Sequence, residues 1–275
     1  MTASAPSTET TSSPESEGGL AASVGRTAFE GIEAAREIYG VLVRTLYYVA
    51  RARIDRDAVI RQMYEIGNRS VFLLTVVIGF IGMIFVLQAG LQMQRVIPDL
   101  TMLGASFLEL LVRDLAPSIV ALMLATRVGA GIAAEIGSMV VTEQVDALRM
   151  CAADPVDYLV KPRFLACLVM TTVLTMWSGA CSVVSGMVTA EVIFGVMPRT
   201  FWNLSLVHAS DVVTGLTKCV AYGAAIPIVS SHCGLSTFGG SEGVGSATTR
   251  AVVQSSLAVI VLNFIISSAA FIVFK

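Results

Sequence analysis

The sequence predicts an all-α membrane protein with five transmembrane helices, and two observations lead to this prediction. Of the 275 residues, 55% are hydrophobic and only 14% are charged, whereas soluble domains average about 25% charged residues. The apolar residues also gather in long stretches without a charged side chain, at 70–94, 164–190, 219–241 and 251–274. Each stretch exceeds the roughly 20 residues that a helix needs to cross the hydrocarbon core. A segment alone in lipid must satisfy its own backbone hydrogen bonds, so helix is the expected structure.

The residues before the first uncharged stretch divide into two zones. Residues 1–19 are rich in Ser, Thr and Glu and lack the basic start and apolar core of a signal peptide, so we expect a disordered tail. Residues 20–69 carry eight arginines, with apolar residues such as Ile38, Leu42 and Leu46 at helical spacing. This pattern predicts an amphipathic helix in the membrane interface. A soluble amphipathic helix that binds a partner protein is the alternative.

Residues 70–275 are expected to form one membrane domain. We place its spans at about 70–91, 100–131, 164–194, 211–231 and 251–274. The stretch 135–157, between the second and third spans, is polar and carries too many charges to cross the bilayer. It is therefore expected to form a helical connection outside the membrane.

The distribution of basic residues predicts the orientation of the chain. With the N-terminus inside, thirteen Lys and Arg residues fall in cytoplasmic segments, and only Arg95, Arg199 and Lys275 fall outside. Because Lys and Arg accumulate in cytoplasmic loops, we expect a cytoplasmic N-terminus and a C-terminus on the outer side. We find no internal repeat of the kind that builds the inverted halves of many secondary transporters.

The second predicted span contains charged residues, among them Glu109, Arg113 and Asp114. Charges at membrane depth are costly and usually face protein or an aqueous cavity. Glu109 and Arg113 are four residues apart and share a helix face, and Asp114 lies one step around from Arg113. Two interpretations stay open. The trio forms a polar patch on a substrate path or subunit contact, or the helix begins deeper and leaves Glu109 near the outer headgroups.

Two features of the sequence follow this patch. Small residues spaced four apart predict close helix packing, and they form two pairs, Gly129 with Ala133 and Ala130 with Ala134. Further on, Thr142 followed by acidic residues is typical of a helix start. The short polar helix predicted there is either an ordinary loop helix or a docking helix for a cytoplasmic partner.

Other functional classes find little support. The five cysteines form no C-x-x-C pair, and we assign no metal to them or to the isolated His208 and His232. The phosphate-binding pattern G-x-x-x-x-G-K-[ST] is absent, so we expect no cofactor on this chain, and any ATP must be hydrolysed by another polypeptide. Basic runs with interleaved aromatic residues are also absent, which argues against nucleic acid binding. Without a nucleophile near the charged trio, we do not expect an enzyme.

Several motifs follow one another along the chain: Arg113-Asp114-Leu115-Ala116-Pro117, Thr126-Arg127-Val128-Gly129-Ala130, Ala134-Glu135-Ile136-Gly137-Ser138-Met139, Glu143-Gln144-Val145-Asp146-Ala147-Leu148, Asp154-Pro155, Lys161-Pro162-Arg163-Phe164-Leu165-Ala166, and the segment from Gly240 to Val253. This block resembles the MlaE/YrbE family of ABC transporter permeases, and the resemblance covers residues 70–275. The chain departs from the family pattern at three places. The first motif often reads R-E-L-G-P, Gly often stands where this chain has Thr126, and Pro227 is not expected in the fourth span.

The resemblance implies a transport function and several partners. Permeases of this family are homodimers that bind a cytoplasmic ABC ATPase and work with an MCE-domain protein on the outer side. They carry phospholipid or related lipid between the two membranes of double-membraned bacteria. The resemblance therefore implies a multi-pass protein of the inner membrane with a periplasmic C-terminus, and it assigns ATP and Mg to the partner ATPase.

The resemblance also assigns roles to residues. The helix that contacts the ATPase corresponds to Glu143, Gln144, Val145, Asp146, Ala147 and Leu148. Arg113 and Asp114, with Glu109 from the same patch, are implied as polar contacts of the lipid cavity. Two other functions stay open on the residues alone. An ion- or proton-driven transporter would use this trio as a relay without an ATPase, and a membrane scaffold would transport nothing.

Overall fold

The computed structural model describes residues 36–51, 55–96 and 101–273. The expected tail at 1–19 and the part of the expected interfacial segment at 20–35 lie outside the described residues. The chain divides into two compact units, residues 1–40 and 41–275. Of the first unit only residues 36–40 are described, and they are helical. The arrangement below concerns the second unit.

Within the described residues, five helical segments are long and apolar enough to cross a membrane. They are α2 (Arg56–Val96), the continuous segment Leu103–Val141, the segment Val156–Phe194, α9 (Ala209–Leu235) and α10 (Gly240–Val273). The predicted all-α membrane fold with five spans is confirmed. Helix α2, the segment Val156–Phe194, α9 and α10 each begin before the uncharged stretch that revealed them, because a helix starts at its cap and not at the edge of the lipid.

The first span shows the largest such extension. Helix α2 begins at Arg56 and not near Ser70, so residues 56–69 of the expected interfacial segment belong to the same continuous helix as the first span. Residues 36–51 are also helical. Asp55, the residue before α2, is not helical, so the described part of the expected interfacial segment is not one continuous helix.

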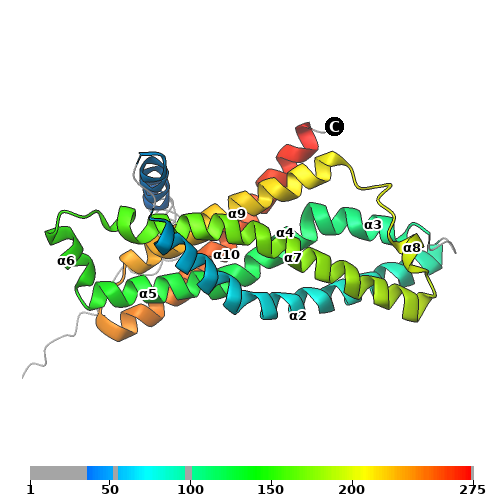
Figure 1. Ribbon diagram of the computed structural model, residues 1–275, viewed down its shortest axis with the longest axis horizontal. Coiled ribbons are helices and arrows are strands. Elements are labelled where there is room, and N and C mark those ends of the chain that lie inside the picture. Colours follow the sequence, from blue (N-terminus) through cyan, green and yellow to red (C-terminus); the bar gives the residue numbers. More distant parts are fainter. Residues whose placement is uncertain (1–35, 52–54, 97–100, 274–275) are drawn as a thin grey trace, which may run out of the picture. The chain divides into compact units, whose positions relative to one another are not determined.

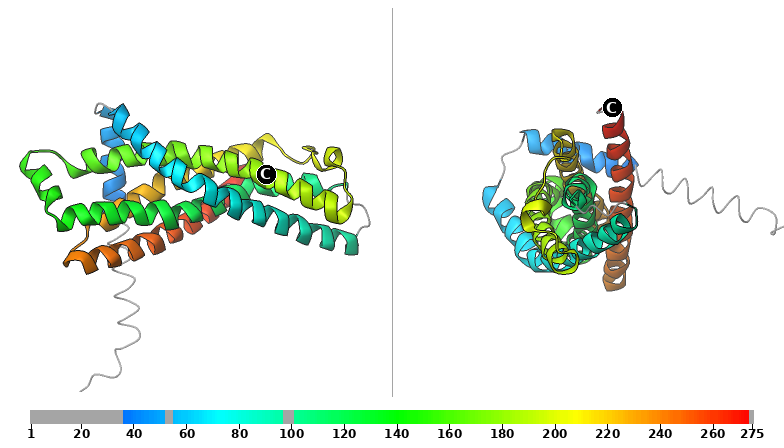
Figure 2. Two further views of the ribbon diagram at one scale, coloured as in Figure 1. Left: turned by 60° about the horizontal axis from the view of Figure 1, so that its bottom comes forward. Right: turned by 90° about the vertical axis from the view of Figure 1, so that its right-hand side faces the viewer.

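The long helices of the second unit lie alongside one another (Figures 1 and 2). Helix α2 packs along α7 (Lys161–Phe194), α7 contacts α9, and α9 contacts α10. The main apolar cluster takes residues from all five spans, including Leu74, Leu124, Leu174, Ile226 and Val259. The short helices α6 (Gln144–Met150) and α8 (Pro198–Phe201) lie at opposite ends of this arrangement (Figure 1).

The second span contains two π-helical segments. It consists of α3 (Leu103–Leu110), η1 (Leu111–Leu115), α4 (Ala116–Leu124), η2 (Ala125–Gly129) and α5 (Ala130–Val141). A third such segment, η3 (Val156–Val160), opens the third span. Segments η1 and η3 each end two residues before a proline, Pro117 or Pro162, which has no N–H for the carbonyl one turn earlier. Short π-helical segments occur frequently at functional sites.

The four small residues of the second span occupy two kinds of position. Gly129 and Ala133 are buried, whereas Ala130 and Ala134 are half-buried. A Cβ atom on Gly129 would lie 2.9 Å from Ser230 Oγ and 3.3 Å from Ser255 Oγ, so this glycine allows α9 and α10 to approach η2. Ala133 packs with Cys233 and Ala251 from the same two helices.

Helix α10 is apolar, but the rest of the chain buries little of its surface. In the most apolar 18-residue stretch of α10 only 6% is buried, whereas 56% is buried in the corresponding stretch of α9. Large side chains such as Leu257, Val261 and Phe264 are exposed. In a protein that spans a membrane, such side chains face lipid or another subunit.

Gly215 of α9 marks a second close approach, and it yields a prediction. A Cβ at this position would overlap with the backbone carbonyl oxygen of Val112. We expect Gly215→Ala to lower the free energy of unfolding by about 1–3 kcal/mol, because backbone atoms cannot move aside as a flexible side chain can. Unfolding in mixed detergent micelles measures this change.

Gly245→Ala is the matched control, because Gly245 also lies in a helix and has no neighbouring atom within 4 Å of a built Cβ. The control should be neutral or stabilising, since alanine favours helix over glycine by about 1 kcal/mol. Equal effects of the two substitutions would contradict the close approach.

Candidate functional site

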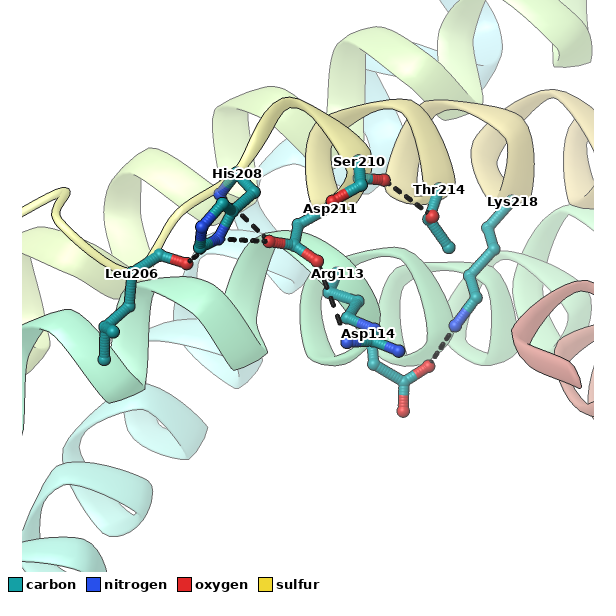
Figure 3. A network of polar contacts seen from close by, with 8 residues as sticks. All are labelled: Arg113, Asp114, Leu206, His208, Ser210, Asp211, Thr214 and Lys218. Carbon is teal, nitrogen blue, oxygen red and sulfur yellow. Dashed lines mark hydrogen bonds and ion pairs between the residues drawn. The ribbon is translucent and has the colours of Figure 1, made fainter. Parts of the chain in front are cut away.

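Charged residues of the second span meet charged residues of the fourth span (Figure 3). Arg113 and Asp114 lie in η1, and Asp211 and Lys218 lie in α9. Arg113 Nη1 is 3.7 Å from Asp211 Oδ1, and Lys218 Nζ is 2.5 Å from Asp114 Oδ1. Asp211 and Lys218 are seven residues apart, which is about two helical turns, so both face η1. The two helices are therefore joined by two ion pairs of alternating sign.

The Lys218 ammonium group is the most buried charge of this network. Its side chain is 1% exposed, whereas that of Asp114 is 41% exposed. The same carboxylate oxygen of Asp114 also accepts a hydrogen bond from Ser118 Oγ at 3.3 Å. A charge among apolar helices needs such a partner, because the cost of desolvation is otherwise unmet. Asp114 therefore compensates the charge of Lys218, while part of the Asp114 side chain stays accessible.

Asp211 organises the start of α9. Its carboxylate accepts a hydrogen bond from the backbone N–H of His208 at 3.0 Å, which forms part of a capping box. The ring of His208 lies close by, with Nδ1 2.8 Å from the Leu206 carbonyl oxygen and 3.9 Å from Asp211 Oδ2. Asp211 thus caps α9 and pairs with Arg113 at once.

A cavity of about 310 Å³ adjoins this network. Residues from three spans line it, among them Glu109, Arg113, Asp211 and Phe271. Glu109 is half-buried on α3. The structure therefore brings the three residues of the predicted patch to one region, where Arg113 and Glu109 line the cavity and Asp114 turns to Lys218.

The sequence analysis did not assign a role to Lys218 or Asp211. Lys218 is a cation inside the fourth span, immediately before the uncharged stretch 219–241. An ionisable residue within a transmembrane helix is by default a candidate functional residue. This rule applied to Lys218 as it did to Arg113, so the signal was present in the sequence.

A second candidate site lies at the opposite end of the spans, around α6. Glu143 has a φ of +59° and Ala152 a φ of +57°, so a left-handed residue stands on each side of the helix. Such backbone is uncommon for residues other than glycine and is found in sharp turns and at functional sites. The chain therefore turns abruptly into α6 and abruptly out of it.

The expected helix start at Thr142 is wrong in detail. Thr142 follows the last residue of α5, and its hydroxyl donates back to the Ser138 carbonyl oxygen at 2.8 Å. Threonine makes this backward bond readily at the end of a helix, and its sequence signal cannot be told from that of an N-cap. Helix α6 begins two residues later at Gln144, and Glu143 lies before it in the turn.

Most of the predicted coupling segment is exposed. Val145 is buried, Leu148 is half-buried, and the other members are exposed: Glu143, Gln144, Asp146 and Ala147. Asp146 pairs with Arg149 on the surface at 3.0 Å. Met150, at the end of α6, is 90% exposed. The predicted coupling segment therefore presents carboxylates on a surface outside the spans, and Met150 adds a large apolar side chain next to them.

An ion pair joins α5, which precedes α6, to α7, which follows it. Arg163 Nη2, on a side chain that is 4% exposed, lies 2.8 Å from Glu135 Oε1. Arg163 Nη1 also donates to the Leu159 carbonyl oxygen at 2.7 Å. This contact joins the start of α7 to α5, so a force on α6 reaches two spans together.

A hydrogen bond joins helix 36–51 to the turn that follows α6. The Tyr48 hydroxyl donates to Asp154 Oδ2 at 2.7 Å, while Asp154 Oδ1 accepts the backbone N–H of Val156 at 2.9 Å. The hydrogen bond to Asp154 and the negative charge of that carboxylate raise the pKa of Tyr48 above its ordinary value. The phenol therefore remains a donor at neutral pH and is lost as a donor only above that raised pKa.

The Lys218–Asp114 pair leads to a prediction on stability. Asp114→Asn leaves the buried Lys218 ammonium group without its anion, so we expect a loss of about 3 kcal/mol in the free energy of unfolding. The double variant Lys218→Met with Asp114→Asn removes both charges and should lose less than the single variant. Unfolding in mixed micelles measures both. Strict additivity of the two single changes would contradict a direct pair.

The Tyr48 contact leads to a prediction on local order. We expect Tyr48→Phe to speed amide hydrogen exchange in residues 143–153, because the turn after α6 loses a tether. Tyr47→Phe is the control, since Tyr47 is 54% exposed and packs edge-on against Tyr48. Hydrogen exchange with mass spectrometry compares them. If both variants exchange alike, the hydrogen bond does not hold the turn.

The chain is similar to known permeases over most of its length. The family model described as Permease MlaE matches residues 59–269. A probable ABC transporter permease protein, slr1045 of Synechocystis sp., is 38% identical over 80% of this chain and 84% of its own length. A probable ABC transporter permease protein of Rickettsia bellii is 32% identical over 92% of this chain and 93% of its own length.

A plant protein extends the comparison. The chloroplastic protein TRIGALACTOSYLDIACYLGLYCEROL 1 of Arabidopsis thaliana is 30% identical over 81% of this chain, which spans 64% of the plant protein. The family model covers both the charged network and the α6 segment. With most of its length matched by that model and by these relatives, the chain belongs to the MlaE family of ABC transporter permeases.

Proposed function

We propose that this permease moves phospholipid or a related lipid between the inner and outer membranes of a bacterium. A transporter of the ABC class requires an ATPase, and this chain carries no phosphate-binding pattern of that kind. A lipid cargo is supported by the name of the plant relative, which is that of a glycolipid. The observation that carries the proposal is the separation of two sites, with a charged network towards the α8 end and the exposed α6 segment at the other.

The charged network suits the polar part of a lipid. The Arg113 guanidinium is 41% exposed and holds Asp211 through a single nitrogen at 3.7 Å. A guanidinium has five donors, so most of them remain available for a phosphate or another acceptor. Asp114 and Glu109 complete the polar contacts, while the surrounding spans supply apolar walls for the acyl chains.

The proposal includes a set of partners. The exposed apolar face of α10 would pack against a second copy of the chain in a homodimer. An ABC ATPase carrying ATP and Mg would bind the Glu143–Leu148 segment in the cytoplasm, and an MCE-domain protein would meet the outer side. This places the permease in the inner membrane with its N-terminus cytoplasmic and its C-terminus periplasmic, as the distribution of Lys and Arg favours.

Coupling would proceed through rigid contacts. A movement of the ATPase would push α6, which is held by left-handed turns at Glu143 and Ala152. The Arg163–Glu135 ion pair would pass that movement to the second and third spans together. The second span carries η1, so the same helix links α6 to the charged network.

An ion- or proton-driven mechanism is the rival proposal. It would need the carboxylates of the network to change partner or protonation during transport. Asp114 and Asp211 are each engaged in an ion pair, so a relay would first have to break those pairs at a substantial cost. Membership of an ABC permease family also favours ATP as the energy source.

Charge reversal in the α6 segment tests the proposal. We expect Glu143→Lys with Asp146→Lys to lower the lipid moved per ATP hydrolysed by about tenfold or more, because like charges at an interface cost several kcal/mol. Transport of labelled phospholipid and ATP hydrolysis are measured together in proteoliposomes that contain the permease and its ATPase.

Asp57→Lys with Glu242→Lys is the matched control, because both residues are exposed and the charge change is the same. This control should transport as the unmodified protein does. Normal transport by the α6 variant would remove the coupling role from this segment. Absence of ATP-dependent lipid movement in the unmodified complex would instead overturn the lipid cargo.

A further inference from the structure

A cavity of about 470 Å³ lies between α2, η2 and α5, away from the charged network. Its polar lining comes from Gln62, Glu65, Arg69, Ser70, Arg127 and Glu135. Apolar side chains complete the wall, namely Ile66, Val128 and Ile132. The proposed transport function gives this cavity no role.

The charges around this cavity leave one cation uncompensated. Glu65 pairs with Arg69 at 3.0 Å, and Glu135 pairs with Arg163 at 2.8 Å. Arg127 makes a hydrogen bond to Ser70 Oγ at 3.3 Å. In the part of the chain that the structure describes, no carboxylate lies within ion-pair distance of the Arg127 guanidinium. Glu65, Arg69, Arg127 and Glu135 of the lining, together with Arg163 behind Glu135, therefore sum to one positive charge.

Arg127 lies at the depth where lipid headgroups are expected. Its partner Ser70 is the first residue of the uncharged stretch 70–94 of α2. The preceding residues on the cavity side, Glu65 and Arg69, are charged, so the boundary between polar and apolar surroundings falls at Ser70. The ends of a bilayer's hydrocarbon core meet the phosphate groups at such a boundary.

Arg127 also lies in a π-helical segment. Segment η2 spans Ala125–Gly129, and Arg127 is its middle residue. Segment η1 likewise contains Arg113 and Asp114 of the charged network. Because π-helical segments occur frequently at functional sites, the backbone around Arg127 independently marks this position.

We propose that this cavity binds the phosphate group of a membrane phospholipid from the leaflet on the α6 side, with Arg127 as the cation that recognises it. A guanidinium can donate two parallel hydrogen bonds to a phosphate. Ser70 holds the Arg127 side chain towards the cavity, and the apolar wall covers the first part of the acyl chains. The charge of the phosphate satisfies the one cation that the surrounding carboxylates leave unmatched.

This site goes beyond the proposed function, because it lies towards the α6 end and is separate from the Arg113 network. Binding at this site requires neither the ATPase nor any movement of lipid. Its test therefore fails or succeeds independently of the transport assay.

Native mass spectrometry of the full-length protein in detergent tests the site. The probes are phosphatidylglycerol and a diacylglycerol with the same acyl chains, which lacks the phosphate. We expect the unmodified protein to prefer phosphatidylglycerol by about tenfold, and Arg127→Gln to lose that preference through about tenfold weaker binding. Arg127→Lys should restore part of the affinity because the charge returns.

Two further variants separate recognition from general damage. Arg61→Gln removes an exposed arginine of α2 outside this cavity and should bind as the unmodified protein does. Gly131→Leu fills the cavity without changing any charge, and a Cβ on Gly131 has no atom within 4 Å, so the helix accommodates it. We expect Gly131→Leu to lose phosphatidylglycerol while its thermal unfolding is unchanged or occurs at a higher temperature.

Three outcomes overturn the inference. They are unchanged phosphatidylglycerol binding in both Arg127→Gln and Gly131→Leu, equal binding of diacylglycerol by the unmodified protein, and displacement of the lipid by millimolar inorganic phosphate alone. The last outcome would assign the cavity to a free phosphate instead of a lipid headgroup.

Discussion

Burial of the Lys218 ammonium group constrains how the second and fourth spans can pack. An ammonium ion surrounded by apolar helices needs an anion at contact distance, and Asp114 supplies it at 2.5 Å. Asp211, two turns before Lys218 on α9, forms a second ion pair with Arg113. In this pair α9 supplies the negative charge and η1 the positive one. A shift of one helix along the other by a single turn would break both pairs. The ion pairs therefore set the register of η1 against α9, while Gly215 lets the two backbones come close enough to form them.

The π-helical segments η1 and η3 have a common cause in the second and third spans. Pro117 and Pro162 withhold an N–H from the preceding turn, and a π-helical segment precedes each of them. A wider turn changes the angle at which later side chains leave the helix, so Arg113 and Asp114 can face α9 together although they are neighbours in sequence. The same helix then continues through Arg127 to Val141 and ends beside α6. One span thus connects all three regions to which we assign functions.

The sequence predicted four of the five spans because a long uncharged stretch has one physical explanation in a chain of this composition. It also singled out Arg113 and Asp114, because charges at membrane depth usually face protein or an aqueous cavity. It did not predict which residues would meet them, because Asp211 and Lys218 lie about a hundred positions away and contact depends on packing. The helix start was misplaced at Thr142 since a hydroxyl can cap either end of a helix. The Tyr48–Asp154 hydrogen bond could not be predicted either, because its two residues are far apart in the sequence and meet only through packing.

The poor burial of α10 has a consequence for how the protein is made. This helix carries no charged side chain after Arg250 within its described length, and its surface already suits a hydrocarbon solvent. It can enter the bilayer and persist there without a neighbour to cover it. Insertion of α10 and its packing against another protein are therefore separable stages, and one folded bundle can diffuse in the membrane by itself. The proposed homodimer would then assemble at a rate set by the density of subunits in the bilayer.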